Sequence, residues 1–271
     1  LHWQTPSNST RAVVPGSALA RWQDCGPSVR IRMALQGPYD ASTGLMKDDL
    51  RVAGYIPTLE PYTAFGYQMN GGSGSTVSSA TLAVTGINAI VDWVLVELRN
   101  ATTPSIIVST RTALLQRDGD VVGPDGYSSL IFNVAPGNYN VAVRHRSHLS
   151  VMTSASVLLN SGLAMIDMTS ALQTTYGTNA QKTSPNGKRA LWCGNVNGDN
   201  RLMYTGSPND RDLILTRIGG VIPTNTVFGY YREDVNMNGN VRYTGTGNDR
   251  DLILMNIGGI IPTTVKMEQL P

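Results

Sequence analysis

A tandem repeat in the last third of the chain constrains its fold more than any other feature. Residues 195–224 (NVNGDNRLMYTGSPNDRDLILTRIGGVIPT) and 234–263 (DVNMNGNVRYTGTGNDRDLILMNIGGIIPT) align at an offset of 39 residues, and 18 of the 30 positions are identical. Such duplication indicates two copies of one supersecondary unit. Each copy has Asn or Asp at alternate positions, then an apolar residue, a second acidic cluster and an apolar stretch closed by Gly-Gly.

The alternating oxygen-bearing side chains are typical of a loop that binds Ca²⁺, a cation that takes roughly 6–8 oxygen ligands. The position where a closing bidentate carboxylate is expected is Gly206 or Gly245. We therefore infer a six-residue insertion that moves this ligand to the start of a short helix. The sequence predicts two Ca²⁺ per chain. The predicted ligands are Asn195, Asn197, Asp199, the Arg201 carbonyl, Asp210 and Asp212 in one site, and Asp234, Asn236, Asn238, the Asn240 carbonyl, Asp249 and Asp251 in the other.

The alternative is that these Asn, Asp and Gly residues only form turns. Two copies that keep the same oxygen pattern favour cation binding over that alternative.

The repeat pair resembles the dockerin-type calcium repeats of secreted surface proteins from Bacteroidetes-type bacteria. The strings that carry the resemblance are YTG-x-x-NDRD (204–212 and 243–251) and IGG-x-x-PT, and the segments VRIRMALQGPYDASTGLMKDDLR, AIVDWVLVELR, LLQRDGDVV and YNVAVRHRSHLSVMT are also similar to that family. The resemblance covers most of residues 28–271 and implies a secreted, cell-surface, calcium-binding module. Asn195, Asn200 and Asn238 depart from the family pattern, which prefers Asp, Gly and Asp there.

Upstream of the repeats, the sequence is typical of a β protein. Apolar stretches separated by Gly, Pro, Asn and Asp turns predict strands at 29–35, 77–84, 90–98, 106–112, 130–134, 139–144 and 151–159. This spacing predicts an antiparallel sandwich over residues 25–168. The string DGYSSLIFNVAPGNYNVAV (125–143) is similar to the last strands of transthyretin-like and carboxypeptidase-regulatory-like domains.

The expected fold class is therefore mostly β: an antiparallel Ig-like or transthyretin-like sandwich followed by a small dockerin-like module of short helices and loops. Residues 1–24 are expected to form an extended N-terminal arm, 169–190 a linker or surface loop, and 191–271 the duplicated calcium module.

Composition excludes several classes of protein. The 21 basic and 19 acidic residues give a formal net charge of +2, and without a basic stripe the chain is not expected to bind nucleic acid. No stretch of 18 apolar residues exists, so no membrane span is expected. The absence of a signal peptide before Leu1 fits a processed secreted protein or a shortened chain.

Two cysteines, Cys25 and Cys193, lie at the borders of the central region. In an oxidising compartment they are candidates for a disulfide, and the alternative of two buried free thiols stays open. Asn8 and Asn100 stand in N-x-[ST] contexts, which are weak candidates for glycosylation. His145 and His148 would converge on a metal if they lay in a turn, and the alternative is a pair of hydrogen-bonded surface histidines.

Catalysis is not expected, because no histidine accompanies a Ser or Cys nucleophile in a recognisable motif. We expect a secreted structural protein of the bacterial surface, a fibre subunit that assembles head to tail with copies of itself. The assembly residues would be apolar residues of the arm: Trp3, Val13, Val14, Leu19 and Trp22. The alternative is a calcium-dependent adhesin or anchoring module that binds glycans or other surface proteins.

Overall fold

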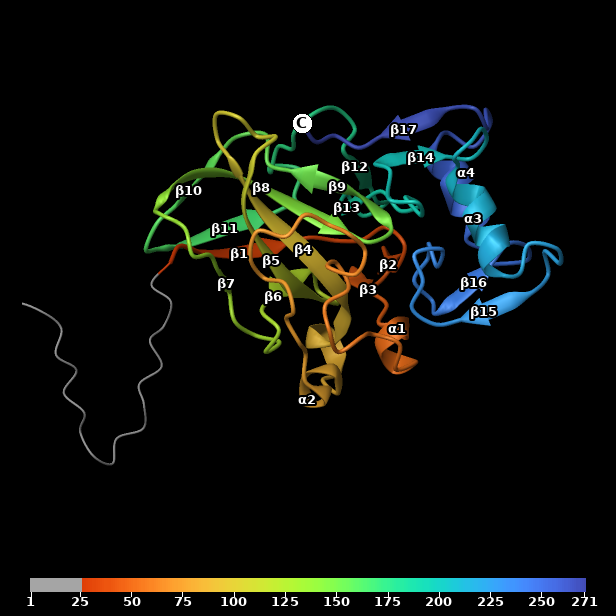
Figure 1. Cartoon of the computed structure of the whole chain (residues 1–271), viewed down its shortest axis with the longest axis horizontal. Helices are drawn as coiled ribbons and strands as arrows, with labels where there is room; N and C mark the ends of the chain where they lie inside the picture. Colours follow the sequence, from red (N-terminus) through yellow and green to blue (C-terminus); the bar gives the residue numbers. More distant parts are fainter. Residues whose placement is uncertain (1–25) are drawn as a thin grey trace, which may run out of the picture.

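The structure is a computed structural model that describes residues 26–271. The expected arm with its five apolar residues, together with Cys25 and Asn8, lies outside the described residues. The described chain is mostly β (Figure 1). Its strands are β1 (Ser28–Arg32), β2 (Tyr39–Asp40), β3 (Leu45–Met46), β4 (Ile90–Asn100), β5 (Ile107–Gln116), β6 (Asp120–Val122), β7 (Leu130–Ile131), β8 (Gly137–His145), β9 (His148–Met152), β10 (Val157–Leu159), β11 (Leu163–Asp167), β12 (Gln181–Thr183), β13 (Arg189–Leu191), β14 (Arg201–Met203), β15 (Thr226–Phe228), β16 (Asn240–Arg242) and β17 (Val265–Met267).

The helices are short. They are α1 (Asp49–Val52), α2 (Ser79–Leu82), the 3₁₀ turn η1 (Gly86–Asn88), α3 (Asp210–Arg217) and α4 (Arg250–Asn256). Among residues 26–271, no helix has the length and apolar character needed to cross a membrane.

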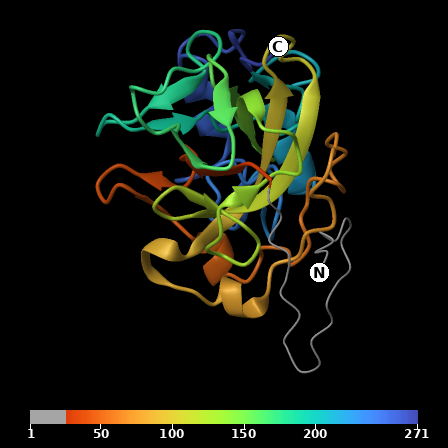
Figure 2. The same cartoon turned by 90° about the vertical axis from the view of Figure 1, so that its left-hand side faces the viewer.

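One large sheet forms the body of the molecule. Its strand order is β10-β8-β4-β5-β6-β1-β11, with β7 also paired to β1 and β9 also paired to β8. The pairing of β1 with β11 is parallel, and the other recorded pairings in this sheet are antiparallel. β10 and β11 stand at opposite ends of the strand order, yet only residues 160–162 separate them in the chain. The sheet therefore curls until its two end strands meet (Figure 1; Figure 2 faces this side).

β4 is an interior strand between β8 and β5 and is buried along almost its whole length. One face of the sheet at β4 is covered by the irregular segment that precedes α2. The Tyr62 hydroxyl donates to the Trp93 carbonyl at 2.8 Å, and the Trp93 indole donates to the Pro57 carbonyl at 2.8 Å. Because both faces are covered, the charged side chains of β4 are buried and need partners. Glu97 lies 2.7 Å from the Arg99 guanidinium and 2.6 Å from that of Arg144.

The expected strands at 29–35, 90–98, 106–112 and 139–144 are confirmed as β1, β4, β5 and β8. The stretch 130–134 contributes only the short β7, and 151–159 splits into the end of β9 and all of β10. The stretch 77–84 was expected to be a strand, and this is wrong. It forms α2, because Ser78 is an N-cap whose hydroxyl accepts a 3.0 Å hydrogen bond from the Thr81 amide.

Residues 169–190 do not form a free linker. They contain β12 and lead into β13, which pair as an antiparallel hairpin. Ala180, Ala190 and Leu191 belong to the main hydrophobic core. Ala180 in the middle of this polar segment, with Ala190 and Leu191 at its C-terminal end, attaches it to the main core.

The repeat module, which we define as residues 191–271, packs against the turn that follows β1. A side chain at Gly37 would clash with the Val235 carbonyl, so glycine permits this close approach. Met237 of the second repeat is 1% exposed and joins the main core. The Asn256 amide donates to Gln36 and to the Cys193 carbonyl at 2.9 and 2.8 Å. The module is thus joined to the sheet by apolar and polar contacts.

Candidate metal centre

The two repeats form one unit related by an approximate two-fold arrangement. Strand β14 of the first repeat pairs with β17, which follows the second repeat, while β16 of the second repeat pairs with β15, which follows the first. Thr205 donates to the Pro262 carbonyl and Thr244 to the Pro223 carbonyl, each at 2.9 Å. The strand that follows each repeat therefore pairs with a strand of the other repeat.

In the second loop (residues 234–242), the side chains of alternate residues fold the backbone into a tight turn. The Asp234 carboxylate accepts hydrogen bonds from the amides of Asn238 and Gly239 at 3.1 and 2.8 Å. The Asn236 side-chain oxygen accepts from the Asn238 amide at 3.0 Å. Met237 and Gly239 take left-handed backbone angles, with φ of 60° and 82°. These oxygens occupy the first, third and fifth positions that a calcium loop uses.

The first loop (residues 195–203) has the same backbone with different chemistry. Gly198 and Asn200 have left-handed φ values of 75° and 66°, at the positions equivalent to Met237 and Gly239. Asn195 replaces the carboxylate of Asp234, and its buried side-chain oxygen has no hydrogen-bond partner among the described residues. The Asp199 carboxylate is paired with the Arg201 guanidinium at 2.8 Å.

The predicted main-chain ligands, the carbonyls of Arg201 and Asn240, lie on the loop side of their strands. The Glu268 amide donates to the Asn200 carbonyl, and the Gly229 amide donates to the Gly239 carbonyl. In an antiparallel pair of strands, the residue after a hydrogen-bonded one points its amide and carbonyl away from the partner strand. Arg201 follows Asn200 and Asn240 follows Gly239, so both point their main-chain groups toward the loops. The Arg201 and Asn240 amides accordingly donate to Asp199 and Asn238 inside the loops.

Each loop is closed by a buried carboxylate, Asp210 or Asp249. Asp210 accepts hydrogen bonds from the amides of Val196, Asn197 and Met203 at 2.7, 3.2 and 2.8 Å. Asp249 repeats this pattern at the equivalent amides, with the same three distances. Both carboxylates are 0% exposed.

Burial changes the charge state that these carboxylates prefer. It raises the pKa of Asp210 to about 7 and that of Asp234 to about 6. Burial, followed by the nearby charge of Asp234, raises the pKa of Asp249 well above its usual value. Two carboxylates that disfavour each other's ionisation in a buried loop are stabilised by a bound cation.

Asp212 and Asp251 lie outside the loops. Asp212 accepts from the side chains of Asn209 and Arg211 at 2.8 and 2.9 Å, and Asp251 makes the equivalent contacts with Asn248 and Arg250. Their side chains are 56% and 51% exposed. This differs from their predicted role as closing ligands, because the Asn and Arg neighbours hold both carboxylates at the surface.

The oxygen donors of the second loop fit Ca²⁺ better than those of the first. Asp234, Asn236, Asn238, the Asn240 carbonyl and Asp249 provide hard oxygen atoms, which this cation prefers. In residues 26–271 no group of three or more His, Cys, Asp or Glu side chains forms a metal cluster. In the second loop only two carboxylates take part, so amide and main-chain oxygens would supply the other ligands.

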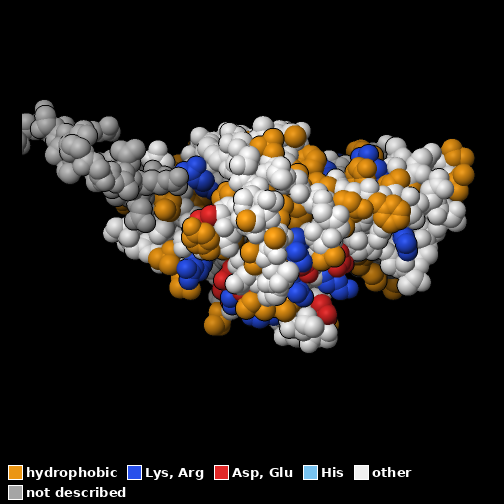
Figure 3. Space-filling model, turned by 90° about the horizontal axis from the view of Figure 1, so that it is seen from below, with side chains coloured by type: hydrophobic (Ala, Val, Ile, Leu, Met, Phe, Trp, Pro, Cys, Tyr) orange, Lys and Arg blue, Asp and Glu red, His pale blue; other side chains and the backbone are white. Residues whose placement is uncertain are grey.

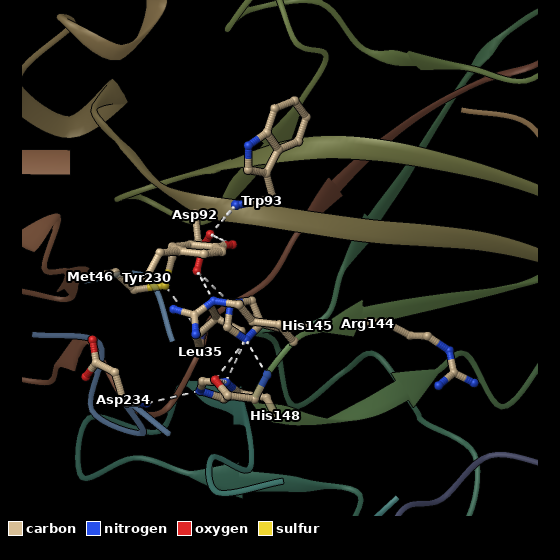
Figure 4. Close-up of polar contacts among 12 residues, drawn as sticks. Leu35, Met46, Asp92, Trp93, Arg144, His145, His148, Tyr230 and Asp234 are labelled. Atoms are coloured by element: carbon tan, nitrogen blue, oxygen red, sulfur yellow. Dashed lines mark hydrogen bonds and ion pairs between the residues drawn. The ribbon is translucent and has the colours of Figure 1, made fainter. Parts of the chain in front are cut away.

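A second buried site lies between the sheet and the repeat module (Figure 4). The Asp92 carboxylate of β4 accepts from the Arg146 guanidinium at 3.1 Å, from the Tyr230 hydroxyl at 2.6 Å and from the Trp93 amide at 2.7 Å. His145 lies 3.1 Å from the same carboxylate. Although burial opposes ionisation, Arg146 and His145 hold the pKa of Asp92 below its usual value.

We call this site the polar cluster; it comprises Asp92, His145, Arg146, His148 and Tyr230. Its two histidines are hydrogen-bonded to each other, with 2.8 Å between their Nδ1 atoms. The Gly37 amide donates to Nε2 of His148, so we infer that His148 carries its proton on Nδ1 and donates it to His145. His145 then carries its proton on Nε2, which faces Asp92. Both histidines are 1% exposed, which corrects the expectation of surface histidines. The Nδ1 lone pair of His145 accepts the Nδ1 proton of His148, so neither Nδ1 atom is available to a shared metal.

Burial lowers the pKa of His145, and burial together with the neighbouring His145 lowers the pKa of His148 further. Both imidazoles are therefore neutral at neutral pH. Arg146, Asp92 and Tyr230 were not identified from the sequence. The signal that would have identified Asp92 is an acidic residue within the apolar strand sequence IVDWVLVEL, because such a residue must find a cation or donor inside the fold.

The remaining predicted residues take separate places. Cys193 is fully buried, and burial raises the pKa of its thiol to about 12. Its pairing with Cys25 stays a prediction. Asn100 is exposed at the end of β4, where its side chain accepts from the amides of Thr102 and Thr103.

Comparison of the chain with protein-family models, with curated proteins and with solved structures gives no match.

Proposed function

We propose that this chain is a non-catalytic structural protein, secreted to the bacterial surface, whose repeat module is stabilised by two Ca²⁺. The observation that supports this best is the pair of buried carboxylates in the second loop, Asp234 and Asp249. Each accepts amide hydrogen bonds, yet burial raises both pKa values. A divalent cation would compensate the two negative charges at neutral pH.

The proposal extends to fold and assembly. The curled sheet is compatible with an Ig-like or transthyretin-like sandwich, and the crossed repeats are compatible with a dockerin-like unit. The arm at 1–24 would join neighbouring copies head to tail into a fibre. The buried Asp92–His145 contact supports a structural role over catalysis, because both side chains are 0% exposed and a catalytic pair must contact substrate.

The test is calorimetric titration of the chain with Ca²⁺ after chelation, with melting temperatures measured in Ca²⁺, Mg²⁺ and chelator. Two binding events are expected, the tighter one at the second loop. The Asp234→Asn variant should lose the tighter event and keep the weaker one. No heat of binding, together with a melting temperature unaffected by chelator, would contradict calcium binding.

A second candidate function is adhesion, and one observation favours it. The stretches that follow α3 and α4 expose Val221, Ile222, Ile260 and Ile261, at 85, 53, 89 and 59%. Apolar side chains gather at the end of the molecule formed by the repeat module (Figure 3). Exposed apolar groups of this kind often mark a binding surface. The Ile222→Ser/Ile261→Ser variant should reduce attachment to bacterial or host surfaces under the adhesion proposal and leave it unchanged under the fibre proposal.

A further inference from the structure

Within the described chain, an ion pair of the first loop has no counterpart in the second. The Arg201 guanidinium donates to Oδ2 of Asp199 at 3.2 and 2.8 Å, through Nε and Nη2. The Arg201 amide donates to Oδ1 of the same carboxylate at 3.1 Å. One arginine thus contacts both oxygens of a predicted calcium ligand. Its side chain is 36% exposed, so water and salt screen its charge only in part.

The second loop makes the same turn with uncharged side chains. Asn238 and Asn240 occupy the positions of the ion pair, and the Asn240 amide donates to the Asn238 side-chain oxygen at 2.9 Å. The carboxylates of this loop, Asp234 and Asp249, accept main-chain amides. Within residues 26–271 neither carboxylate is paired with an arginine, Arg242 at the end of the loop included.

Arginines from other segments add to this contrast. A side chain at Gly198 would clash with the Arg232 guanidinium, so this cation lies against the backbone of the first loop. Beside the second loop, the Tyr231 carbonyl accepts from the Arg146 guanidinium and from the Asp234 amide. Arg146 is already paired at 3.1 Å with the carboxylate of the polar cluster. Arg232 has no such partner in the described chain, so the first loop lies beside more unpaired positive charge.

The first loop still provides oxygen atoms for a cation. The Asn195 side chain is buried, at 3% exposure, and its oxygen has no hydrogen-bond partner among the described residues. A buried oxygen without a partner is unfavourable, and a cation would satisfy it. Because Asn195 is uncharged, the negative charge of this site comes from Asp199 and Asp210. Neutralising Asp199 therefore removes half of that charge.

We propose that Arg201 is a tethered cation that lowers the affinity of the first loop for Ca²⁺ and makes the second loop fill first. The inference rests on the proposed calcium binding and names the residue that makes the two sites unequal. The guanidinium neutralises Asp199, and its own charge repels an arriving divalent ion. It contacts only Oδ2, so Oδ1 of Asp199 stays available as a ligand. The ion pair thus weakens the first site without removing it.

The first experiment compares Arg201→Asn, which introduces the residue of the second loop, with the matched control Arg211→Asn. Arg211 lies outside the loops and is paired with Asp212 at 2.7 Å, so the control removes the same charge from a similar ion pair. Ca²⁺ titration is followed by NMR at the amides of Gly198 and Gly239, one in each loop.

Arg201→Asn should tighten binding at the first loop by roughly tenfold or more and leave the second loop unchanged. Arg211→Asn should change neither affinity. Equal tightening by both variants would assign the effect to the net charge of the repeat module and would overturn the inference.

A reciprocal experiment transfers the arginine to the second loop. Asn240→Arg keeps the predicted main-chain ligand and adds a guanidinium beside the uncharged Asn238, so it measures the repulsion alone. The control is Met255→Arg, at a 57% exposed position of α4 outside the loops. Asn240→Arg should weaken the tighter binding event by roughly tenfold, and Met255→Arg should leave it unchanged. An unchanged affinity in Asn240→Arg would overturn the inference.

Melting temperatures provide a second readout. In chelator, Arg201→Asn should melt below the unsubstituted chain because the ion pair is lost. Saturating Ca²⁺ should raise the melting temperature of Arg201→Asn by more, since its first loop binds the ion more tightly. A gain no larger than that of the unsubstituted chain would contradict tighter binding.

The outcomes separate this inference from the proposed function. If the second loop binds Ca²⁺ while Arg201→Asn leaves the affinity of the first loop unchanged, only the inference fails. If neither loop binds Ca²⁺ in the unsubstituted chain or in Arg201→Asn, the calcium proposal fails and the inference fails with it. If the first loop binds Ca²⁺ only in Arg201→Asn, the inference stands and the unsubstituted chain binds one Ca²⁺ instead of two.

Discussion

Met237 combines two properties that rarely occur together in one residue. Its φ is 60°, a left-handed value that costs a residue with a side chain roughly 1–2 kcal/mol. Its side chain is 1% exposed and packs in the main core, away from its own repeat. The equivalent residue of the first repeat is Gly198, whose φ of 75° is also left-handed and which has no side chain. Burial of one methionine offsets the backbone cost and attaches the module to the sheet.

At position 237 the glycine variant should therefore be more stable than the alanine variant, the reverse of the usual order. Met237→Ala loses the buried side chain and keeps the backbone cost, so we expect a loss of about 2–4 kcal/mol in the free energy of unfolding. Met237→Gly loses the same side chain but relieves the left-handed cost, so it should be about 1 kcal/mol more stable than the alanine variant. Urea unfolding measures both. An alanine variant that is the more stable of the two would contradict this account.

The buried histidine pair makes stability depend on pH. The unfolded chain takes up protons at histidine near pH 6.5, whereas burial lowers both folded pKa values. Because the unfolded state then binds more protons, the contribution of the pair to stability is complete above about pH 7 and is lost as the pH falls below 6.5.

The His148→Gln variant tests this dependence. It lacks one of the protons that the unfolded chain takes up, so its stability deficit relative to the unsubstituted chain should shrink by about 1.4 kcal/mol between pH 7.5 and 5.5. Urea unfolding at both pH values gives the difference, and NMR should show both rings titrating at a lower pH in the folded protein than in the unfolded chain. A deficit that stays constant with pH would show that His148 takes up its proton over the same pH range in the folded and unfolded states, and would contradict this account.

At the scale of elements, the two aspartates at the start of each repeat helix have different roles despite their proximity. Asp249 holds three loop amides, and Asp251 lies at the surface beside Arg250. Asp249→Ala should leave those amides without partners and destabilise the module by several kcal/mol, beyond what Ca²⁺ restores. Asp251→Ala should change stability by less than about 1 kcal/mol. Thermal unfolding with and without Ca²⁺ distinguishes the two variants, and equal effects would contradict the assignment.

The sequence predicted the long strands well because β4, β5 and β8 keep their apolar pattern over nine to eleven residues. It failed at 77–84, where the capping hydroxyl of Ser78 overrides an apolar stretch. Alternate spacing marked the loop oxygens, and both acidic residues at each helix start, Asp249 with Asp251 and Asp210 with Asp212, were predicted as ligands. Asp249 and Asp251 stand two residues apart, and only the packing of the helix start decides which of them faces the loop.

At the scale of the whole molecule, the polar cluster connects sheet and repeats through Arg146. Its side chain is 0% exposed, its guanidinium lies 4.1 Å from the centre of the Tyr230 ring, and it donates to the Tyr231 carbonyl. Asp92 and Arg146 are fully buried, so removal of one leaves the other charge without its main partner. Arg146→Met should cost about 3–5 kcal/mol, and Asp92→Asn/Arg146→Met should recover part of it. Equilibrium unfolding of Asp92→Asn, Arg146→Met and the double variant measures the coupling energy between the two residues. Strictly additive changes in the free energy of unfolding would show that the two residues are not coupled.

The crossed pairing of β14 with β17 and of β15 with β16 also has a consequence for biosynthesis. A ribosome releases the first loop long before residues 265–267, which form β17. The first repeat therefore waits for its partner strand until more than sixty residues later in the chain, as the separation of Arg201 and Met267 shows. The strand pairing of the two repeats can consequently be completed only after residues 265–267 have been synthesised. If the first loop binds Ca²⁺ as proposed, its uptake should then follow the completion of the chain.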